Sequence, residues 1–268
     1  MRGLALLLLV ALPLRAQTPA AEVARERAEF TAWLATDPLS PYAALGLQPI
    51  GPGISVGAEP SDLPLAGVPR GILTEEGPSV VLTSDGARRI LPRGRAVPLS
   101  VTARLVITGG PGRAVAASFG TVRRATPPQF FAYAPSLRFA VRLDPPERRG
   151  RFPVLGLDGA ETDANEAGFV RVTMTGATTR LRVYRLGAAD DDEAPLFIYF
   201  RDATNGRETY PAGRFIELLP SADGGYELDF NRARNPYCAY SSVFPCPAPW
   251  PGNRLAAAVR AGEQYHAP

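Results

Sequence analysis

The chain has 268 residues, with 29 basic and 26 acidic side chains and a single histidine, so its formal net charge is +3. Such a small excess of positive charge argues against a nucleic-acid partner. Every basic residue is an arginine, which excludes a P-loop lysine and a Schiff-base lysine. One histidine also excludes zinc sites that are built on several histidines.

The first residues have the pattern of a secretory signal peptide. Met1 and Arg2 form a short positive start, an apolar run extends from Gly3 to Leu14, and Ala16 is a small residue at the expected cut. This run is shorter than the roughly 20 residues that a membrane-spanning helix needs. We therefore expect a signal peptide over residues 1–16, export to the periplasm or the extracellular space, and no stable membrane insertion after cleavage. An uncleaved anchor and an unusual buried N-terminal helix are the alternatives.

One helix is expected after the signal peptide. Thr18 can cap its first turn, Pro19 suits the first helical position, and apolar residues recur on one face. Asp37 precedes Pro38 and ends the helix, because a residue before proline avoids helical backbone angles. The rest of residues 17–70 is rich in proline and glycine, and we expect an irregular connection there.

The remainder of the chain, residues 71–268, predicts a β-rich domain. Its β-branched and aromatic runs are bounded by turn residues, and helical patterns do not alternate with them, which argues against a doubly wound α/β fold. The expected fold class is mainly β, an antiparallel sandwich, roll or barrel with one N-terminal helix. The expected strands are Ser79–Thr83, Val97–Ile107, Arg113–Val122, Leu137–Leu143, Phe169–Met174, Arg180–Leu186, Leu196–Phe200, Phe215–Leu219 and Tyr226–Phe230.

Two cysteines stand near the end of the chain. Cys238 and Cys246 are separated by a short loop with prolines around it. In an exported chain they would meet an oxidising environment, so we expect a structural disulfide between them. A redox-active pair is the alternative, and it would need a thiol pKa lowered by a helix N-terminus or a neighbouring base.

Polar side chains gather beside apolar strand residues in the last third of the chain. The strand-like run Leu196–Phe200 leads into a segment that contains Asn205-Gly206, a strong tight-turn pair. A hairpin at this turn would bring the polar residues on its two arms together. The candidate ligand-binding residues are Asp202, Thr204, Glu208, Tyr210, Arg214, Asp229, Asn231, Asn235, Asn253 and Arg254.

Motifs in this stretch resemble a known family. They are F-x-D-x-T-x-G-x-E-T-Y-x-x-G-R at residues 200–214, L-D-F-N at 228–231, N-P-x-C-A-Y at 235–240, C-P at 246–247, N-R-L at 253–255 and A-G-E at 261–263. In this order they resemble the bacterial and archaeal family catalogued as domain of unknown function 1684, over about residues 128–265. Arg234 and Tyr237 depart from the pattern, which has an aromatic residue and a proline there. The family has no established activity, cofactor or catalytic residue, so the resemblance implies a shared fold and a shared polar cluster.

Three interpretations of the polar cluster remain open. In the first, Arg214 and Arg254 line a pocket for a small polar or anionic ligand, because arginine offers a fork of donors suited to carboxylate or phosphate. In the second, Asp202, Glu208 or Asp229 acts as the general acid or base of a hydrolase. In the third, the network is structural. We expect no metal and no cofactor, and no feature of the sequence predicts an oligomeric state.

Overall fold

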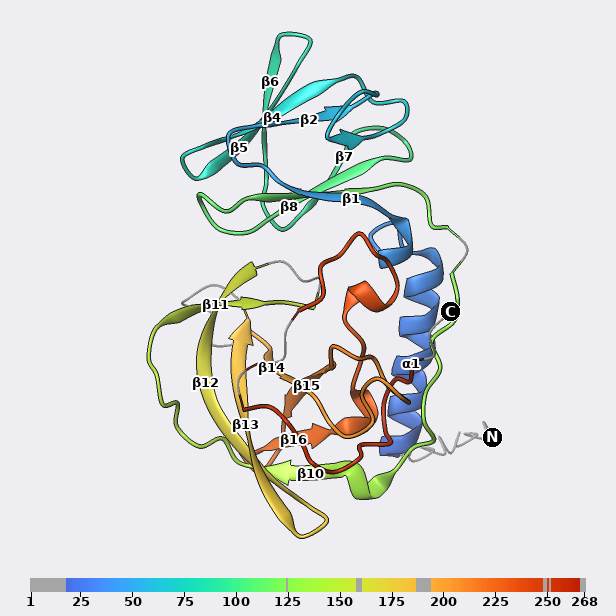
Figure 1. Ribbon diagram of the computed structural model, residues 1–268, viewed down its shortest axis with the longest axis vertical. Coiled ribbons are helices and arrows are strands. Elements are labelled where there is room, and N and C mark those ends of the chain that lie inside the picture. Colours follow the sequence, from blue (N-terminus) through green and yellow to red (C-terminus); the bar gives the residue numbers. More distant parts are fainter. Residues whose placement is uncertain are drawn as a thin grey trace, which may run out of the picture.

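The computed structural model describes residues 18–123, 125–157, 161–186, 194–247, 250 and 252–265. The signal peptide expected at residues 1–16 lies outside the described residues. Figure 1 shows two β-rich parts, one above the other, with a long helix beside the lower part. The prediction of a mainly β fold with one N-terminal helix is therefore confirmed.

The helix, α1, spans Pro19–Thr36 and begins and ends where the sequence predicts. Thr18 Oγ1 accepts a hydrogen bond from the N–H of Ala21 at 3.3 Å, and the proline occupies the first turn, where its missing N–H costs no helical hydrogen bond. Asp37 follows with extended backbone angles and caps the C-terminus. In the described part of the chain, no helix combines the length and the apolar character needed to cross a membrane.

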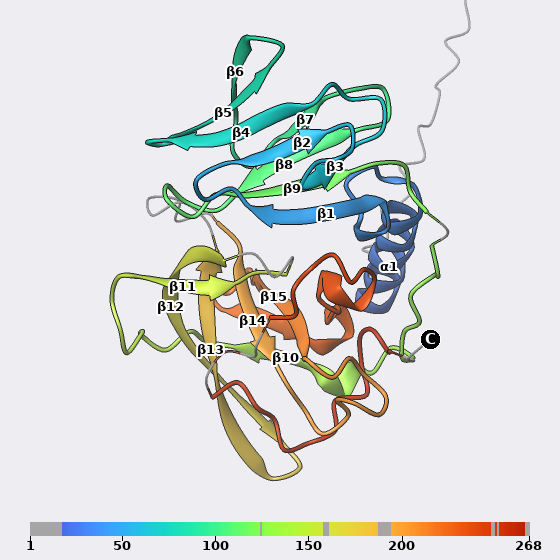
Figure 2. The same ribbon diagram turned by 45° about the horizontal axis from the view of Figure 1, so that its top comes forward.

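The helix packs against the C-terminal half of the chain, not against the strands that follow it in sequence (Figure 2). The two terminal nitrogens of Arg27 donate to the carbonyl oxygens of Phe131 and Asn231, each at 2.9 Å. The ring of Phe30 meets the ring of Tyr240 edge to face, with 6.3 Å between centroids. The first β-rich part is thus inserted between two segments that fold together.

The upper β-rich part holds nine strands of the described residues in two sheets. Their orders are β1-β9-β8-β7 and β3-β2-β4-β5-β6, and all pairs are antiparallel except β2 with β3. Buried residues from both sheets, among them Val56, Leu73 and Leu105, form one core. The strands are β1 (Ala44–Pro49), β2 (Ile54–Gly57), β3 (Leu63–Pro64), β4 (Gly71–Glu76), β5 (Ser79–Ser84), β6 (Ala87–Leu91), β7 (Ala96–Pro98), β8 (Arg104–Thr108) and β9 (Val115–Phe119).

Strands β1, β2 and β3 lie in the segment for which the sequence predicts an irregular connection. They are two to six residues long, and prolines and glycines surround them. β1 pairs with β9, which begins more than 60 residues further along the chain. The local turn signals are genuine, but pairing with distant strands decides the structure here.

The lower β-rich part is one antiparallel sheet of the order β10-β16-β15-β14-β13-β12-β11, which curls like half a barrel (Figure 1). Its core lies inside the curl and includes Val170, Leu181, Ile198 and Ile216. The strands are β10 (Arg138–Val141), β11 (Arg151–Leu155), β12 (Glu161–Met174), β13 (Ala177–Leu186), β14 (Leu196–Phe200), β15 (Arg214–Pro220) and β16 (Tyr226–Asp229). Four 3₁₀ turns of the described residues are η1 (Pro41–Ala43), η2 (Pro135–Leu137), η3 (Phe230–Arg232) and η4 (Tyr237–Ala239).

Residues 259–265, called the C-terminal segment below, run without regular structure across the loops of this sheet. The N–H of Glu263 donates to the carbonyl of Ala233 at 2.8 Å, and the N–H of Phe131 donates to the carbonyl of Gly262 at 3.0 Å. Gly262 has φ +74°, and a Cβ there would lie 2.6 Å from the Ala233 oxygen. Only glycine allows this close approach, which fixes the position of the next residue.

Candidate functional site

Two of the predicted site residues, Asp202 and Arg214, form a buried ion pair. Arg214 Nη2 donates to Asp202 Oδ2 at 2.8 Å, and neither side chain is exposed to solvent. The terminal nitrogens of Arg214 also donate to the carbonyl oxygens of Val259, Ala261 and Glu263. Burial lowers the pKa of the guanidinium, and the charge of Asp202 opposes that shift. Arg214 therefore holds the C-terminal segment and has no terminal nitrogen left for a ligand.

Thr204 and Glu208 lie on the turn that follows β14. Asp202 Oδ1 accepts hydrogen bonds from the N–H and the hydroxyl of Thr204, at 2.8 and 2.6 Å, which closes the turn. Glu208 faces solvent and forms an ion pair with Arg260 at 2.7 Å. The hydrogen bond from that arginine lowers the pKa of Glu208. These residues are neighbours, but they stabilise the turn and its contact with the C-terminal segment.

Cys238 and Cys246 are free thiols, so the predicted structural disulfide is absent from the structure. The hydroxyl of Tyr210 lies 3.2 Å from Cys246 Sγ and joins both thiols in one polar cluster. Burial raises the pKa of Cys238 to about 12, and burial also raises the pKa of Tyr210. A raised pKa keeps a cysteine in its unreactive thiol form.

Two of the predicted asparagines connect separate segments. Asn253 Oδ1 accepts from the N–H of Arg182 at 2.6 Å, and its amide nitrogen donates to the carbonyls of Arg182 and Tyr199, so it joins β13 to β14. Asn231 makes the same two-way link to the backbone of Ala134, at 2.8 and 3.0 Å. Both side chains are buried, and their hydrogen bonds are made within the protein.

Asp229 and Arg254 complete the predicted set. Asp229 Oδ1 accepts from the backbone and side-chain N–H groups of Asn231 at 2.9 and 2.7 Å, and it caps η3. Arg254 is exposed and lies in a segment that pairs with Arg201 through the backbone. The two arginines of the anion-binding hypothesis therefore differ, because Arg214 is enclosed and Arg254 faces solvent.

A cavity of about 350 Å³ lies where four segments, far apart in sequence, meet. Its walls come from Tyr42 in η1, from residues 126–129 in the connection between the two β-rich parts, from residues around η4, and from residues 263–265. We call it the Glu263 cavity. Of the ten predicted ligand-binding residues, Asn235 is the one that lines it.

Glu263 is one of the residues that line this cavity, and its carboxyl group is buried. Its residue is 1 % exposed, Oε2 accepts from the N–H of Asn235 at 2.9 Å, and Oε1 accepts from the hydroxyl of Tyr240. Burial raises the pKa of Glu263 to about 7, and burial together with the Glu263 charge raises the pKa of Tyr240 well above its usual value. Asn235 Oδ1 is also buried and accepts no hydrogen bond from the described residues. The residues that line the cavity thus include a buried carboxyl with a raised pKa and a buried amide oxygen that accepts no hydrogen bond from the described residues.

Sequence reasoning did not select Glu263, Tyr240 or Tyr42 as site residues. The first two belong to the motifs A-G-E and N-P-x-C-A-Y, so a signal for their positions was available. Tyr42 stands in the segment expected to be irregular, and no local pattern marks it. Among the residues that the structure describes, no group of three or more His, Cys, Asp or Glu side chains is placed to hold a metal ion.

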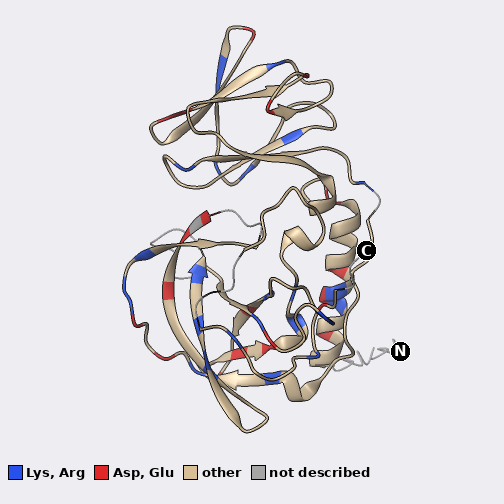
Figure 3. Ribbon diagram, in the orientation of Figure 1, with Lys and Arg blue, Asp and Glu red and all other residues tan. Residues whose placement is uncertain are grey.

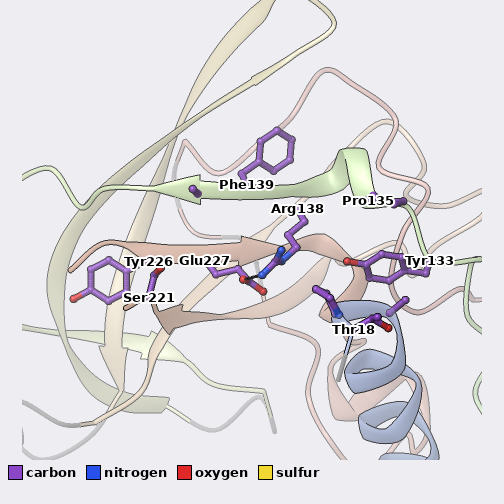
Figure 4. Close-up of a pocket in the computed structure, with 11 residues that line it drawn as sticks. Thr18, Tyr133, Pro135, Arg138, Phe139, Ser221, Tyr226 and Glu227 are labelled. Atoms are coloured by element: carbon purple, nitrogen blue, oxygen red, sulfur yellow. Dashed lines mark hydrogen bonds and ion pairs between the residues drawn. The ribbon is translucent and has the colours of Figure 1, made fainter. Parts of the chain in front are cut away.

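A second hollow, of about 480 Å³, lies between the start of α1 and the strands β10 and β16 (Figure 4). Arg138 from β10 reaches across to Glu227 from β16 and forms an ion pair with it, and the Tyr133 hydroxyl points toward this pair. The hydrogen bond that Arg138 donates to Glu227 raises the pKa of Arg138. Because these charged groups already satisfy each other, the Glu263 cavity is the stronger candidate site.

A family model described as "Protein of unknown function (DUF1684)" matches residues 127–264, slightly more than half of the chain. The solution NMR structure of an uncharacterized protein of Haloarcula marismortui is similar, with 31 % sequence identity over 52 % of this chain and 76 % of that one, and a TM-score of 0.44. No curated protein matches the chain. The matched region includes Asn235, Tyr240 and Glu263, and it excludes Tyr42.

Proposed function

The chain belongs to the DUF1684 family and, because this membership brings no activity with it, we propose that the protein binds a small polar ligand in the Glu263 cavity. The observation that carries the proposal is the buried Glu263 carboxyl in the wall of a 350 Å³ cavity. Burying such a group costs free energy, and the described residues place no cationic side chain at hydrogen-bonding distance of the Glu263 carboxyl to offset that cost. A ligand with hydrogen-bond donors would offset that cost.

The acceptors of the cavity indicate the kind of ligand. The Glu263 carboxyl and Asn235 Oδ1 both accept hydrogen bonds, and no arginine is among the described residues that line the space. Arg214, which the sequence suggested for an anion, is occupied by Asp202 and three carbonyl groups. A donor-bearing polar molecule therefore fits better than an anion.

Ligand-induced stabilisation tests this proposal. We expect at least one of ethanolamine, glucose and acetamide to raise the melting temperature of the full chain, because a ligand that binds only the folded state stabilises it. Glu263→Gln should lose the response, while Glu208→Gln, which changes a half-buried carboxyl outside the cavity, should keep it. Equal responses of the two variants, or none from the wild type, would contradict the proposal.

General acid–base catalysis is a second candidate, which corresponds to the hydrolase alternative. The observation that favours it is the pKa of Glu263, about 7, because an acid or base works best near the operating pH. The predicted carboxylates Asp202 and Asp229 are held instead by internal donors. Hydrolysis of p-nitrophenyl acetate that Glu263→Gln abolishes and Glu208→Gln retains would support catalysis, and equal rates would exclude a role for Glu263.

We also propose that the protein is exported to the periplasm or the extracellular space. The support is the sequence of residues 1–16, with its positive start, short apolar run and small residue at the end. Mass spectrometry of protein purified from its own host should find a chain that begins at Gln17. A chain that retains Met1 would contradict export by cleavage.

A further inference from the structure

Two tyrosine rings form a corner in the wall of the Glu263 cavity. The centroids of Tyr42 and Tyr240 are 5.9 Å apart, and their planes meet at 70°. The hydroxyl of Tyr42 donates to the carbonyl of Thr126 at 3.0 Å, and the ring of Phe30 supports Tyr240 from α1. Both rings are therefore held in place by contacts that do not involve a ligand.

A third tyrosine, Tyr265, lines the same cavity from the C-terminal segment. Its ring meets the ring of Tyr210 edge to face, with 4.7 Å between centroids, and its N–H donates to the carbonyl of Glu208 at 3.0 Å. Three aromatic side chains from three separate segments thus converge on one space, and a carboxyl group lies among them.

The charge in the wall of this space is negative or zero. Glu263 is the one carboxyl among the described lining residues, and none of them is an arginine. Two arginines near Glu263 have other roles: Arg214 is paired with Asp202, and Arg234 stacks on the ring of Phe30 at 4.3 Å and lines a different hollow beside α1.

We propose that the Glu263 cavity binds a small organic ammonium ion, held by the tyrosine rings and by the Glu263 carboxylate. Aromatic rings attract ammonium groups within about 6 Å of their centroids, and cages of such rings recognise quaternary ammonium ligands. A carboxylate in the same wall neutralises the ligand charge. This inference names the ligand class of the proposed function and rests on it.

Protonation of Glu263 should be coupled to this binding. Burial raises its pKa to about 7, while Tyr240, Asn235 and the charge of Arg234 act in the opposite direction. A bound cation favours the carboxylate, so binding below neutral pH releases a proton. By linkage, the affinity for the cation should fall about a hundredfold between pH 8 and pH 5.

Isothermal titration calorimetry of the full chain at pH 8 tests the ligand class. The probes are choline, tetramethylammonium and ethanolamine, and the neutral control is 3,3-dimethylbutan-1-ol, which has the shape of choline without its charge. We expect a cation to bind at least about tenfold more tightly than the neutral alcohol, since cation–π and carboxylate contacts both need the charge. Stronger or equal binding of the alcohol would overturn the ammonium assignment.

Matched variants test the residues that we assign. Tyr42→Phe keeps the ring and should keep most of the affinity for choline, whereas Tyr42→Leu should lose it. Glu263→Gln should weaken binding and remove its dependence on pH, and Glu208→Gln should behave as the wild type. Circular dichroism checks that each variant is folded, and a folded Tyr42→Leu or Glu263→Gln with wild-type affinity would contradict the inference.

The outcome separates this inference from the function on which it rests. If glucose or acetamide binds in a Glu263-dependent manner and the three ammonium ions do not, the cavity is a polar binding site and the ammonium class is wrong. If no probe of either kind binds, both the ligand class and the proposed function fail.

Discussion

Two buried carboxyl groups, Asp202 beside the C-terminal segment and Glu263 within it, have different hydrogen-bond partners. Asp202 accepts from Thr204 and Val259 with one oxygen and from Arg214 with the other, so its hydrogen bonds are made with strong internal donors. Glu263 has no basic partner at hydrogen-bonding distance among the described residues and lines a cavity. A buried polar group indicates a binding site when some of its capacity remains and a ligand can reach it.

Charge distribution over the whole molecule does not make this distinction. Figure 3 shows the described basic and acidic residues interspersed over both β-rich parts. Many of the described arginines lie in exposed ion pairs, such as Arg88 with Glu76. Exposed pairs of this kind contribute little to stability and do not mark a site. The hydrogen-bond partners of each buried group therefore distinguish the two carboxyl groups.

Removal of the Asp202 carboxylate should have the largest effect on stability. Asp202→Ala removes the partner of a fully buried arginine and the cap of the following turn. We expect the free energy of unfolding, measured by urea denaturation, to fall by about 3–5 kcal/mol, because the charge of Arg214 stays buried without compensation. The double variant Asp202→Leu with Arg214→Met should lose less than the sum of the two single changes. Full additivity would show that the pair does not act as a unit.

The sequence predicts the elements whose signals are local. The N-cap at Thr18 and the C-terminal end at Asp37 are each predicted from adjacent residues, and α1 begins and ends there. The strand expected at Leu196–Phe200 is β14, because a short apolar run bounded by turn residues is informative by itself. The family motifs also predict the shared fold, and the match over residues 127–264 agrees with the resemblance.

The sequence does not predict how distant segments meet. The Glu263 cavity needs Tyr42, the connection at residues 126–129, Asn235 and the C-terminal segment, and no local pattern relates these segments. The density of polar residues in the last third of the chain predicts a binding site, but most of these residues have internal hydrogen-bond partners. A similar limit applies to Cys238 and Cys246, because spacing alone does not reveal that the Tyr210 hydroxyl shares their cluster. Tertiary contact decides both cases.

Glu263 should make the free energy of unfolding depend on pH. The pKa of Glu263 is about 7 in the folded protein, above the value of 4.5 for an ordinary glutamate. Between these two values the folded state binds more protons than the unfolded state, so the free energy of unfolding falls as the pH rises. Because Glu263 is fully buried, solvent does not screen this effect, and the difference between the two pKa values corresponds to a loss of about 3 kcal/mol by pH 8. Urea denaturation from pH 4 to pH 8 should show it.

Glu263→Gln isolates that contribution, because the amide keeps the shape and does not titrate. The difference in unfolding free energy between the wild type and the variant should therefore change with pH, and the change should be centred between pH 4.5 and pH 7. A difference that stays constant over this range would show that the carboxyl has an ordinary pKa. The cavity would then lose the feature that distinguishes it from the Asp202 network.

The smallest change in stability should come from Glu208, which is neither a buried paired carboxylate like Asp202 nor a cavity-lining carboxyl like Glu263. Glu208 was a candidate site residue, but its ion pair with Arg260 is exposed, with 35 % and 63 % of the two side chains accessible to solvent. Water and salt screen such a pair, and ordering two long side chains costs entropy. Glu208→Gln should leave the free energy of unfolding within the repeat error of urea denaturation at physiological salt. A loss comparable to that of Asp202→Ala would show that this solvent-accessible carboxylate stabilises the fold as strongly as a buried one. Burial would then not distinguish the carboxylates that the fold needs from those that it does not need.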